Sequence, residues 1–338
     1  MYELKVLIAA LKQMKRPNLF LWNLLINGTK EHTKNKFEVH FKKSRRLMAP
    51  FTAPYVGGEI LEKEGFHARE FEPGVLKPLR RANANELFEQ NFGQTIYGDS
   101  VSNADVATGQ VAEELLELDE SIVRRELWIL GKFLTDGIIP VFGKTVDRAI
   151  KYYCSNIEVL MGTDKWDNSA SDPISDIRRW QLTIQEKTGI IIDSVVLTPA
   201  AAKAFRNNLK VIEQLKLTQV DQLRVNPRSL GDGVTYLGVI PDLNVDIYTY
   251  VDWVINPVTN VEEMIIPDGG VIACKAKSVT VNYGAVAQIV DKKRQIFVGA
   301  RIPKHWVDEN NDNEFLRLAS APLLVPEDVD GHYYSKVV

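Results

Sequence analysis

The segment from Gly137 to Thr145 comes nearest to a chemical motif, because it resembles the phosphate-binding loop of nucleotide-hydrolysing proteins. That motif places four residues between its first glycine and the Gly-Lys-Ser/Thr triplet, after a strand and before a helix. Here five residues separate Gly137 from Gly143, and Pro140 lies between them in a segment that follows a predicted helix. Nucleotide binding is therefore not predicted.

The histidines and cysteines form no pattern typical of a metal site or a catalytic centre. No histidine has a Cys, His or carboxylate partner at metal-ligand spacing, so all five are interpreted as surface or packing residues. They are His32, His40, His67, His305 and His332. Cys154 and Cys274 lie far apart without a CxxC pair, which predicts two reduced thiols in a cytoplasmic product.

The remaining polar and aromatic candidates also have simpler explanations than chemistry. Asp172 and Asp176 are four residues apart at an expected helix start, where capping explains them better than acid–base work. Five tryptophans are expected to anchor cores or interfaces: Trp128, Trp166, Trp180, Trp253 and Trp306. Serine-hydrolase, metalloprotease, calcium-loop and dinucleotide motifs are missing. We therefore predict no catalytic, cofactor-binding or metal-binding residue, no cofactor and no enzyme.

A helix of unusual length organises the elements around these residues. Between Ser102 and Thr135 apolar residues recur at steps of three and four, and Gly137 supplies a stop. One row comprises Val111, Leu115, Leu118, Ile122, Ile129 and Phe133, interrupted by Glu126, and a second comprises Leu116, Val123, Leu127, Leu130 and Leu134. The pattern predicts a spine helix of about 27 to 34 residues, roughly 40–50 Å long.

The whole chain has the composition of a globular protein. It has 338 residues, is 45% hydrophobic and is expected to divide into about two lobes. No apolar run reaches the ~18 residues that a membrane helix needs. The N-terminal residues show no usable signal peptide, so no membrane contact is predicted.

Charge is unevenly distributed along the chain. Residues 1–90 hold 16 Lys/Arg against 10 Asp/Glu, a net charge of +6, whereas the other 248 residues have a net charge of −9. Three interpretations stay open. The basic part is a solvated face, or it reaches acidic surfaces of other copies, or it is a nucleic-acid arm, for which the aromatic residues are few and no known fold surrounds them.

The first 82 residues contain too little local core to fold alone. Residues 1–35 are interpreted as an apolar arm, and residues 36–82 as an extended two-stranded loop whose exposed edges invite pairing with another chain. We expect both segments to bury more surface against other copies than against their own subunit.

The segments after the spine predict an α+β fold with an insertion. Residues 138–154 read as a hairpin, and residues 166–277 alternate helices with strands, which predicts a lobe with a small central sheet. From residue 278 onward strand patterns return, and their expected place is alongside the spine. One domain is therefore assigned to residues 83–165 and 278–338, and the lobe to residues 166–277.

Six short stretches carry a resemblance to a known family. They are Glu70-Phe71-Glu72-Pro73-Gly74 with Lys77-Pro78, Asp172-Pro173 with Asp176-Ile177, Leu197-Thr198-Pro199 with Ala204-Phe205-Arg206, Pro267-Asp268, Ala300-Arg301-Ile302-Pro303-Lys304 with Trp306-Val307, and Ser320-Ala321-Pro322-Leu323. In this order they resemble the lambda-like major capsid proteins of tailed phages, which have the Hong Kong ninety-seven type fold. The resemblance spans almost the whole chain.

The resemblance implies a structural shell subunit that forms hexamers and pentamers of an icosahedral head around double-stranded DNA. Residues 36–82 would be the extended loop, 83–165 with 278–338 the peripheral domain, and 166–277 the axial domain. Scaffold and portal proteins are implied partners, a decoration protein is left open, and DNA contacts would not be sequence-specific. Assembly would occur in the host cytoplasm. The alternatives are an encapsulin-like compartment shell and, from a different class, a small-ligand-binding or enzymatic protein.

Overall fold

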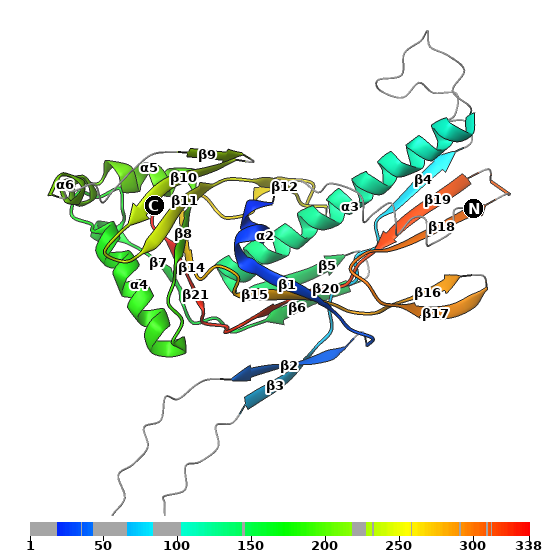
Figure 1. Ribbon diagram of the computed structural model, residues 1–338, viewed down its shortest axis with the longest axis horizontal. Coiled ribbons are helices and arrows are strands. Elements are labelled where there is room, and N and C mark those ends of the chain that lie inside the picture. Colours follow the sequence, from blue (N-terminus) through cyan, green and yellow to red (C-terminus); the bar gives the residue numbers. More distant parts are fainter. Residues whose placement is uncertain are drawn as a thin grey trace, which may run out of the picture.

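The computed structural model describes residues 19–34, 36–42, 66–83, 103–143, 146–217, 228–231, 233–257, 259–290, 292–308, 310–311 and 313–338, and the structural statements below concern these residues. Figure 1 shows an elongated subunit. A lobe of helices and strands occupies one end, a long helix crosses toward the other end, and a two-stranded ribbon projects away from the body.

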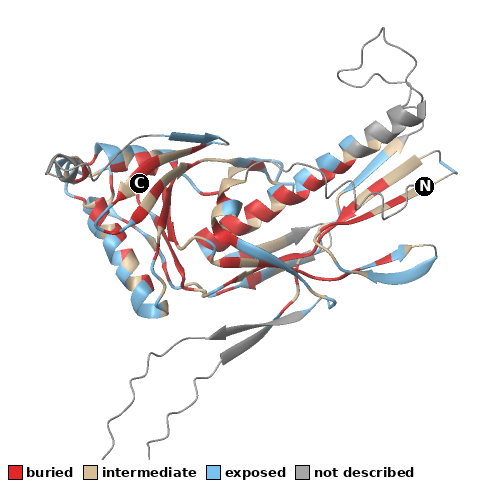
Figure 2. Ribbon diagram, viewed as in Figure 1, coloured by how far each residue is buried: buried red, intermediate tan, exposed pale blue. Residues whose placement is uncertain are grey.

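The long helix α3 confirms the predicted spine, because it runs for 34 residues from Asn103 to Asp136. It ends where Gly137 adopts a φ of 63° and donates its N–H to the Phe133 carbonyl at 3.0 Å. Most of the predicted stripe is buried, namely Leu115, Leu118, Ile122, Val123, Leu127, Leu130, Phe133 and Leu134. Leu116 differs, with 38% of its surface exposed. Figure 2 shows buried and exposed residues alternating along this helix.

The described part of the N-terminal arm packs against its own subunit. Helix α2 (Phe20–Leu25) places Leu21 and Leu25 in the main core that contains the C-terminal half of α3. Strand β1 (Ile26–Glu31) continues from it and pairs in parallel with β15 (Val279–Tyr283). Residues 20–26 therefore pack within their own subunit, because two leucines one helical turn apart fit the core beside α3. Residues 27–31 pair with β15 but are exposed, and the larger burial of the arm against other copies stays a prediction. Residues 1–18 lie outside the described residues.

The extended loop is two-stranded where the structure describes it. Strand β2 (Phe37–Lys42) pairs antiparallel with β3 (Phe66–Phe71), and among the described residues neither strand joins another sheet. The tip of the predicted loop, residues 43–65, lies outside the described residues. Strand β4 (Leu79–Asn83) belongs instead to the sheet β18–β19–β4. That the loop buries more surface against other copies than against its own subunit remains a prediction.

The inserted lobe is built on a seven-stranded mixed sheet in the order β7-β21-β14-β8-β11-β10-β9. The strands are β7 (Ile157–Val159), β21 (His332–Lys336), β14 (Gly270–Cys274), β8 (Ser194–Leu197), β11 (Val245–Tyr250), β10 (Val234–Ile240) and β9 (Arg228–Gly231). Helices α4 (Pro173–Thr188), α5 (Pro199–Asn207) and α6 (Leu209–Leu217) and a 3₁₀ turn (Gly162–Asp164) complete the lobe. As predicted, Asp172 caps α4 by accepting the Ser175 N–H at 3.2 Å.

The C-terminal strands do not all return to the spine. Strands β15 and β20 (Pro322–Pro326) form a three-stranded sheet with β1, and their side chains share the main core with α3. Strand β21 instead lies inside the lobe sheet between β7 and β14. Strand placement therefore crosses the sequence boundaries at residues 165 and 278, because these strands pair across long sequence separations.

Hairpins make up the rest of the body. The predicted hairpin after Gly137 is confirmed as β5 (Ile138–Gly143) and β6 (Val146–Lys151). The others are β12 (Trp253–Ile255) with β13 (Glu262–Met264), β16 (Val286–Val290) with β17 (Lys293–Phe297), and β18 (Ile302–Asp308) with β19 (Asn313–Ala319). Figure 1 shows the last two pairs and the start of α3 at the end opposite the lobe.

Candidate functional site

Among the residues that the structure describes, the histidines and cysteines are dispersed. Within the described residues, no group of three or more His, Cys, Asp or Glu side chains could hold a metal ion. Burial raises the pKa of the Cys154 thiol to about 12 and raises that of Cys274 as well. Neither thiol forms a disulfide. Such raised pKa values disfavour the nucleophilic thiolate.

The histidines are separated in the structure. His332 is buried beside Phe133, with ring centroids 5.0 Å apart, whereas His305 contacts Glu314 across the β18–β19 hairpin. His32 is partly buried, and the side-chain environments of His40 and His67 lie outside what is described. The described histidines therefore pack within the subunit, at three different places.

His332 makes stability depend on pH. Burial lowers its pKa from 6.5 to about 4, so the unfolded chain binds this proton more readily than the folded chain. The associated loss of stability is absent above about pH 6.5, grows as the pH falls and levels off below about pH 4, reaching roughly 3 kcal/mol. We expect the His332→Leu variant to lack this loss of stability at low pH. Denaturant unfolding of both proteins at pH 7 and pH 4.5 checks this. An equal change in the free energy of unfolding between the two pH values in both proteins would contradict it.

The most elaborate polar arrangement is a buried charge cluster between α3 and the returning strands. Arg301 donates from Nη1 and Nη2 to the two carboxylate oxygens of Glu126, each at 2.8 Å, and from Nε to Asp119. Tyr283 donates its hydroxyl to Glu126 at 3.0 Å. All four residues are at most 9% exposed. This charge cluster, Arg301–Asp119–Glu126–Tyr283, ties the middle of α3 to the strands beneath it.

The carboxylate of Glu126 raises the pKa of two of its partners in the charge cluster, Arg301 and Tyr283. Burial alone would lower the pKa of Arg301, but the neighbouring Glu126 carboxylate outweighs this, and the net pKa lies above the usual value for arginine. Burial and the same carboxylate raise the pKa of Tyr283, so its hydroxyl keeps its proton. Sequence reasoning missed this cluster. Its signal was Glu126 on the apolar row with Asp119 two helical turns before it.

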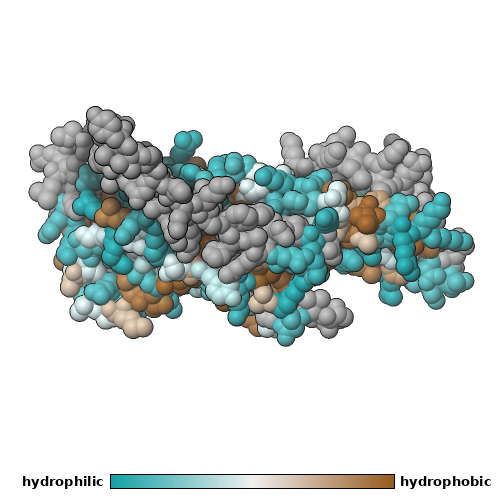
Figure 3. All heavy atoms as spheres, turned by 90° about the horizontal axis from the view of Figure 1, so that it is seen from below, coloured by the Kyte–Doolittle hydropathy of each residue, from teal (hydrophilic) through white to brown (hydrophobic). Residues whose placement is uncertain are grey.

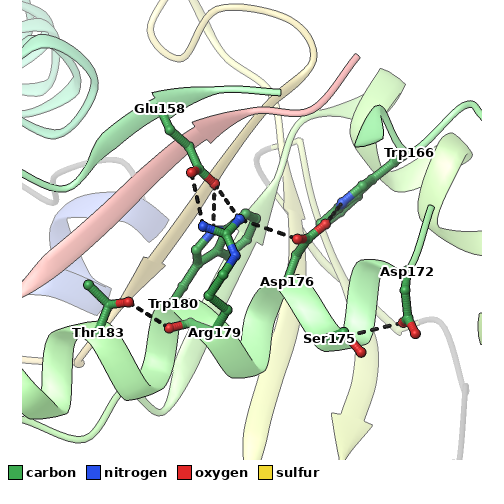
Figure 4. Close-up of polar contacts among 8 residues, drawn as sticks. All are labelled: Glu158, Trp166, Asp172, Ser175, Asp176, Arg179, Trp180 and Thr183. Atoms are coloured by element: carbon green, nitrogen blue, oxygen red, sulfur yellow. Dashed lines mark hydrogen bonds and ion pairs between the residues drawn. The ribbon is translucent and has the colours of Figure 1, made fainter. Parts of the chain in front are cut away.

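A second polar network joins helix α4 to strand β7 at the surface of the lobe (Figure 4). Arg179 donates to both oxygens of Glu158, at 3.1 and 2.8 Å, and to Asp176 at 3.2 Å. Trp180 donates its indole N–H to Glu158 at 2.7 Å, and Trp166 donates to Asp176 at 3.0 Å. Asp172 is the helix cap, as predicted, whereas Asp176 orients a tryptophan.

Partial burial raises the pKa values of the two carboxyl groups in this second network, whereas their hydrogen bonds lower them. Burial raises the pKa of Glu158, but hydrogen bonds from Arg179 and Trp180 lower it more, so the net pKa is below the usual value. For Asp176 burial prevails and the net pKa is raised. With Arg179 nearly half exposed, the network is worth little as an ion pair. It serves to position the two indoles, which stack 5.9 Å apart in the lobe core.

The described surface has grooves and scattered exposed apolar side chains. A groove of about 600 Å³ lies between α3 and the β12–β13 hairpin, with Ile122, Trp128 and Trp253 among its lining residues. Trp253 is half exposed, whereas Trp128, Trp166 and Trp180 are buried as expected. On the face in Figure 3, hydrophobic patches are interspersed with hydrophilic surface. No helix of the described residues is long and apolar enough to cross a membrane.

The described subunit is thus elongated, with a spine helix and a projecting ribbon. The chain matches the family described as phage major capsid protein E over residues 3–337. It is 24% identical to the major capsid protein of Escherichia phage lambda over 304 residues, covering 84% of this chain and 83% of that protein. It is 23% identical to the major capsid protein of Escherichia phage N15, with the same shares covered.

Solved structures agree with this fold. The putative capsid protein of a prophage of E. coli CFT073 superposes with a TM-score of 0.71 at 15% identity, covering 100% of this chain and 99% of that one. The capsid of the native GTA particle gives a TM-score of 0.51 at 10% identity, covering 96% and 93%. The mixed α+β capsid fold of the Hong Kong ninety-seven type is thereby confirmed.

The chain belongs to the phage major capsid protein E family. It is accordingly a tailed-phage major capsid protein that forms the head, a component of the virion capsid and not an enzyme. The resemblance read from the six sequence stretches is confirmed at the level of family, fold and function.

Proposed function

We propose that the subunit assembles as hexamers and pentamers that close into an icosahedral head around double-stranded DNA. The observation that carries this is the match to the capsid family over residues 3–337, which leaves almost none of the chain for another task. The projecting ribbon β2–β3 adds support, since two strands alone are marginally stable in water. A shell in which a neighbour covers the ribbon removes this weakness.

Each domain has a proposed role in this shell. The extended loop at residues 36–82 reaches a neighbour, residues 83–165 with 278–338 form the peripheral domain, and residues 166–277 form the axial domain. The axial domain meets its copies around the five-fold and six-fold axes. The position of β21 inside the lobe sheet favours counting residues 332–336 with the axial domain.

The proposed partners follow from shell building. Scaffold and portal proteins act during assembly, a decoration protein is a further candidate, and packaged DNA is enclosed without sequence-specific contacts. A net charge of −3 supports an enclosed DNA that the shell does not hold tightly through its phosphates, because strong phosphate binding needs an excess of Lys and Arg. The same fold in an encapsulin-like compartment would differ by a groove for cargo peptides and by the absence of DNA.

Imaging the purified assembly tests the proposal. Expression of the full chain together with its scaffold and portal partners is expected to give closed icosahedral particles, and infected cells are expected to yield particles that hold DNA. Particles that hold protein cargo and no DNA would favour the encapsulin-like alternative. A chain that stays monomeric under all these conditions would contradict shell formation.

A further inference from the structure

The sheet β18–β19–β4 lies beside α3 at the end opposite the lobe, and its two faces differ in character (Figure 1). On one face, Leu316 of β19 shares a small core with Leu115 and Leu118 of α3. Arg80 of β4 pairs with Glu117 of α3 at 2.6 Å on the same side. Successive side chains of a strand point to opposite faces, so the residues next to Leu316 and Arg80 point away from α3.

The face turned away from α3 is basic and aromatic. It consists of two rows of residues that lie opposite one another in the strand register, Lys304, Arg317 and Leu79 in one row and Trp306, Phe315 and Arg81 in the other. The rings of Trp306 and Phe315 stack with their centroids 5.2 Å apart. The Lys304 Nζ lies 4.9 Å from the Trp306 ring centroid, and the Arg317 Cζ lies 5.8 Å from it. These six residues are called the basic face.

Within the described residues, no carboxylate pairs with the three cations of the basic face. Arg317 donates to the neutral amide of Gln288 at 2.8 Å, and its Nε is buried without a hydrogen-bond partner. Asp308 follows on the same side of β18 but accepts hydrogen bonds from its own turn. Lys304 lies directly opposite Arg317, and burial together with this positive charge lowers the pKa of Lys304. Because like charges opposite each other destabilise a sheet, an anion supplied from outside would stabilise this one.

The accessible part of the basic face combines charge with apolar surface. Arg81 is exposed and Leu79 is 50% exposed on the edge strand β4, while Trp306 and Phe315 are partly exposed. Tryptophan and arginine are enriched among the residues that dominate protein–protein contacts, whereas nucleic-acid backbones are held mainly by their charge. The composition therefore favours the carboxylates of a protein over the phosphates of DNA.

The chain itself supplies such carboxylates. Residues 91–338 have a net charge of −9. Exposed acidic residues that form no ion pair within the described part include Asp147, Asp164, Asp167 and Glu186. A copy of this chain therefore presents acidic surface that complements the basic face, and a shell brings many copies into contact.

We propose that the basic face binds carboxylates of a second copy of this chain, with Arg81 and Lys304 as its charged contacts and Leu79 and Trp306 as its apolar contacts. Two different surfaces of the subunit meet in this contact, so it repeats from copy to copy and either closes into rings or extends through a lattice. The inference rests on the proposed shell function and names one of its contacts.

Zero-length cross-linking of assembled particles identifies the partner directly. A carbodiimide joins a lysine amine to a carboxylate that touches it, and particles assembled from mixed ¹⁵N-labelled and unlabelled subunits distinguish bonds between copies from bonds within one copy. Lys304 is expected to be joined to an Asp or Glu of another copy in particles and not in unassembled subunits. Lys304→Arg keeps the charge, and it is expected to lose this cross-link while it assembles at the normal rate.

Assembly rates measure the contribution of the two charges. Arg81→Gln with Lys304→Gln is expected to slow particle formation, followed by light scattering of the full chain, about tenfold, because charge complementarity steers association. The same variant is expected to unfold at no lower temperature than the unaltered subunit, since it removes a repulsion. The matched control is Lys203→Gln with Arg228→Gln, which neutralises one exposed lysine and one exposed arginine of the lobe and is expected to assemble normally.

The possible outcomes separate the contact from the shell function. Particles in which Lys304 is joined only within its own copy, or not at all, would overturn the contact. An equal loss of rate in the lobe control would also overturn it. Normal assembly of the Arg81 and Lys304 variant with reduced DNA retention would assign the basic face to the packaged nucleic acid instead. Failure of the unaltered protein to form particles would refute the shell function itself.

Discussion

Leu127→Asp is expected to abolish soluble, folded subunit. Leu127 is 2% exposed in the main core, which also contains Val281 and Leu324 of the returning strands. An aspartate there places an unpaired charge in apolar surroundings at a cost of several kcal/mol, against a typical total stability of ~5–15 kcal/mol. Soluble expression and a thermal unfolding curve measure the outcome, and the loss precedes any question of assembly.

The same helix provides the control. Leu116 also belongs to the predicted stripe, but it is 38% exposed, so Leu116→Asp is expected to change stability by much less. If Leu127→Asp remained soluble with a cooperative unfolding transition, the assignment of the buried face of α3 would be wrong.

Arg301→Leu is expected to destabilise the subunit by about 3–5 kcal/mol, because it leaves two carboxylates buried without their cation. In the native protein the Arg301 guanidinium bridges Asp119 and Glu126. Protonation of the stranded carboxyl groups would relieve the defect, so the deficit should shrink as the pH is lowered. Denaturant unfolding at pH 7 and pH 5 gives the two free energies to compare.

Two further variants isolate the cause. Arg301→Leu combined with Asp119→Leu and Glu126→Leu removes the stranded charges and is expected to recover most of the lost stability. Arg80→Leu breaks an exposed pair with Glu117 on the same helix, where both side chains are more than half exposed, and is expected to cost at most about 1 kcal/mol. Equal losses for Arg80→Leu and Arg301→Leu would show that burial of the charge cluster is unimportant.

The elements that sequence reasoning predicted well are those with strong local signals. The spine follows from apolar residues at steps of three and four, and its end from a glycine in the left-handed region. Helix α4 follows from Asp172-Pro173 at its start and from Gly189, with a φ of 80°, at its end. Each signal lies within a few residues of the element it specifies.

The features that were missed depend on residues far apart in sequence. Strand β7 has three residues with an exposed pattern, and only its partner β21 makes it a strand. The charge cluster joins Asp119 and Glu126 to Arg301, more than 170 residues away. The arm was assigned to neighbouring copies because its apolar residues lack a local core, but α3 and β15 supply one. Local composition shows that a segment needs a partner without showing which partner it has.

The position of β21 means that the lobe sheet can be completed only at the end of translation. Strands β7, β8 and β14 are translated before β15 to β20, and β21 is translated after them, yet β21 lies between β7 and β14. The nascent lobe consequently exposes the edge of β14 until residues 332–336 emerge, while the whole β15–β20 region is being made. An unpaired edge of this kind is open to pairing with another chain until the last strand fills the position.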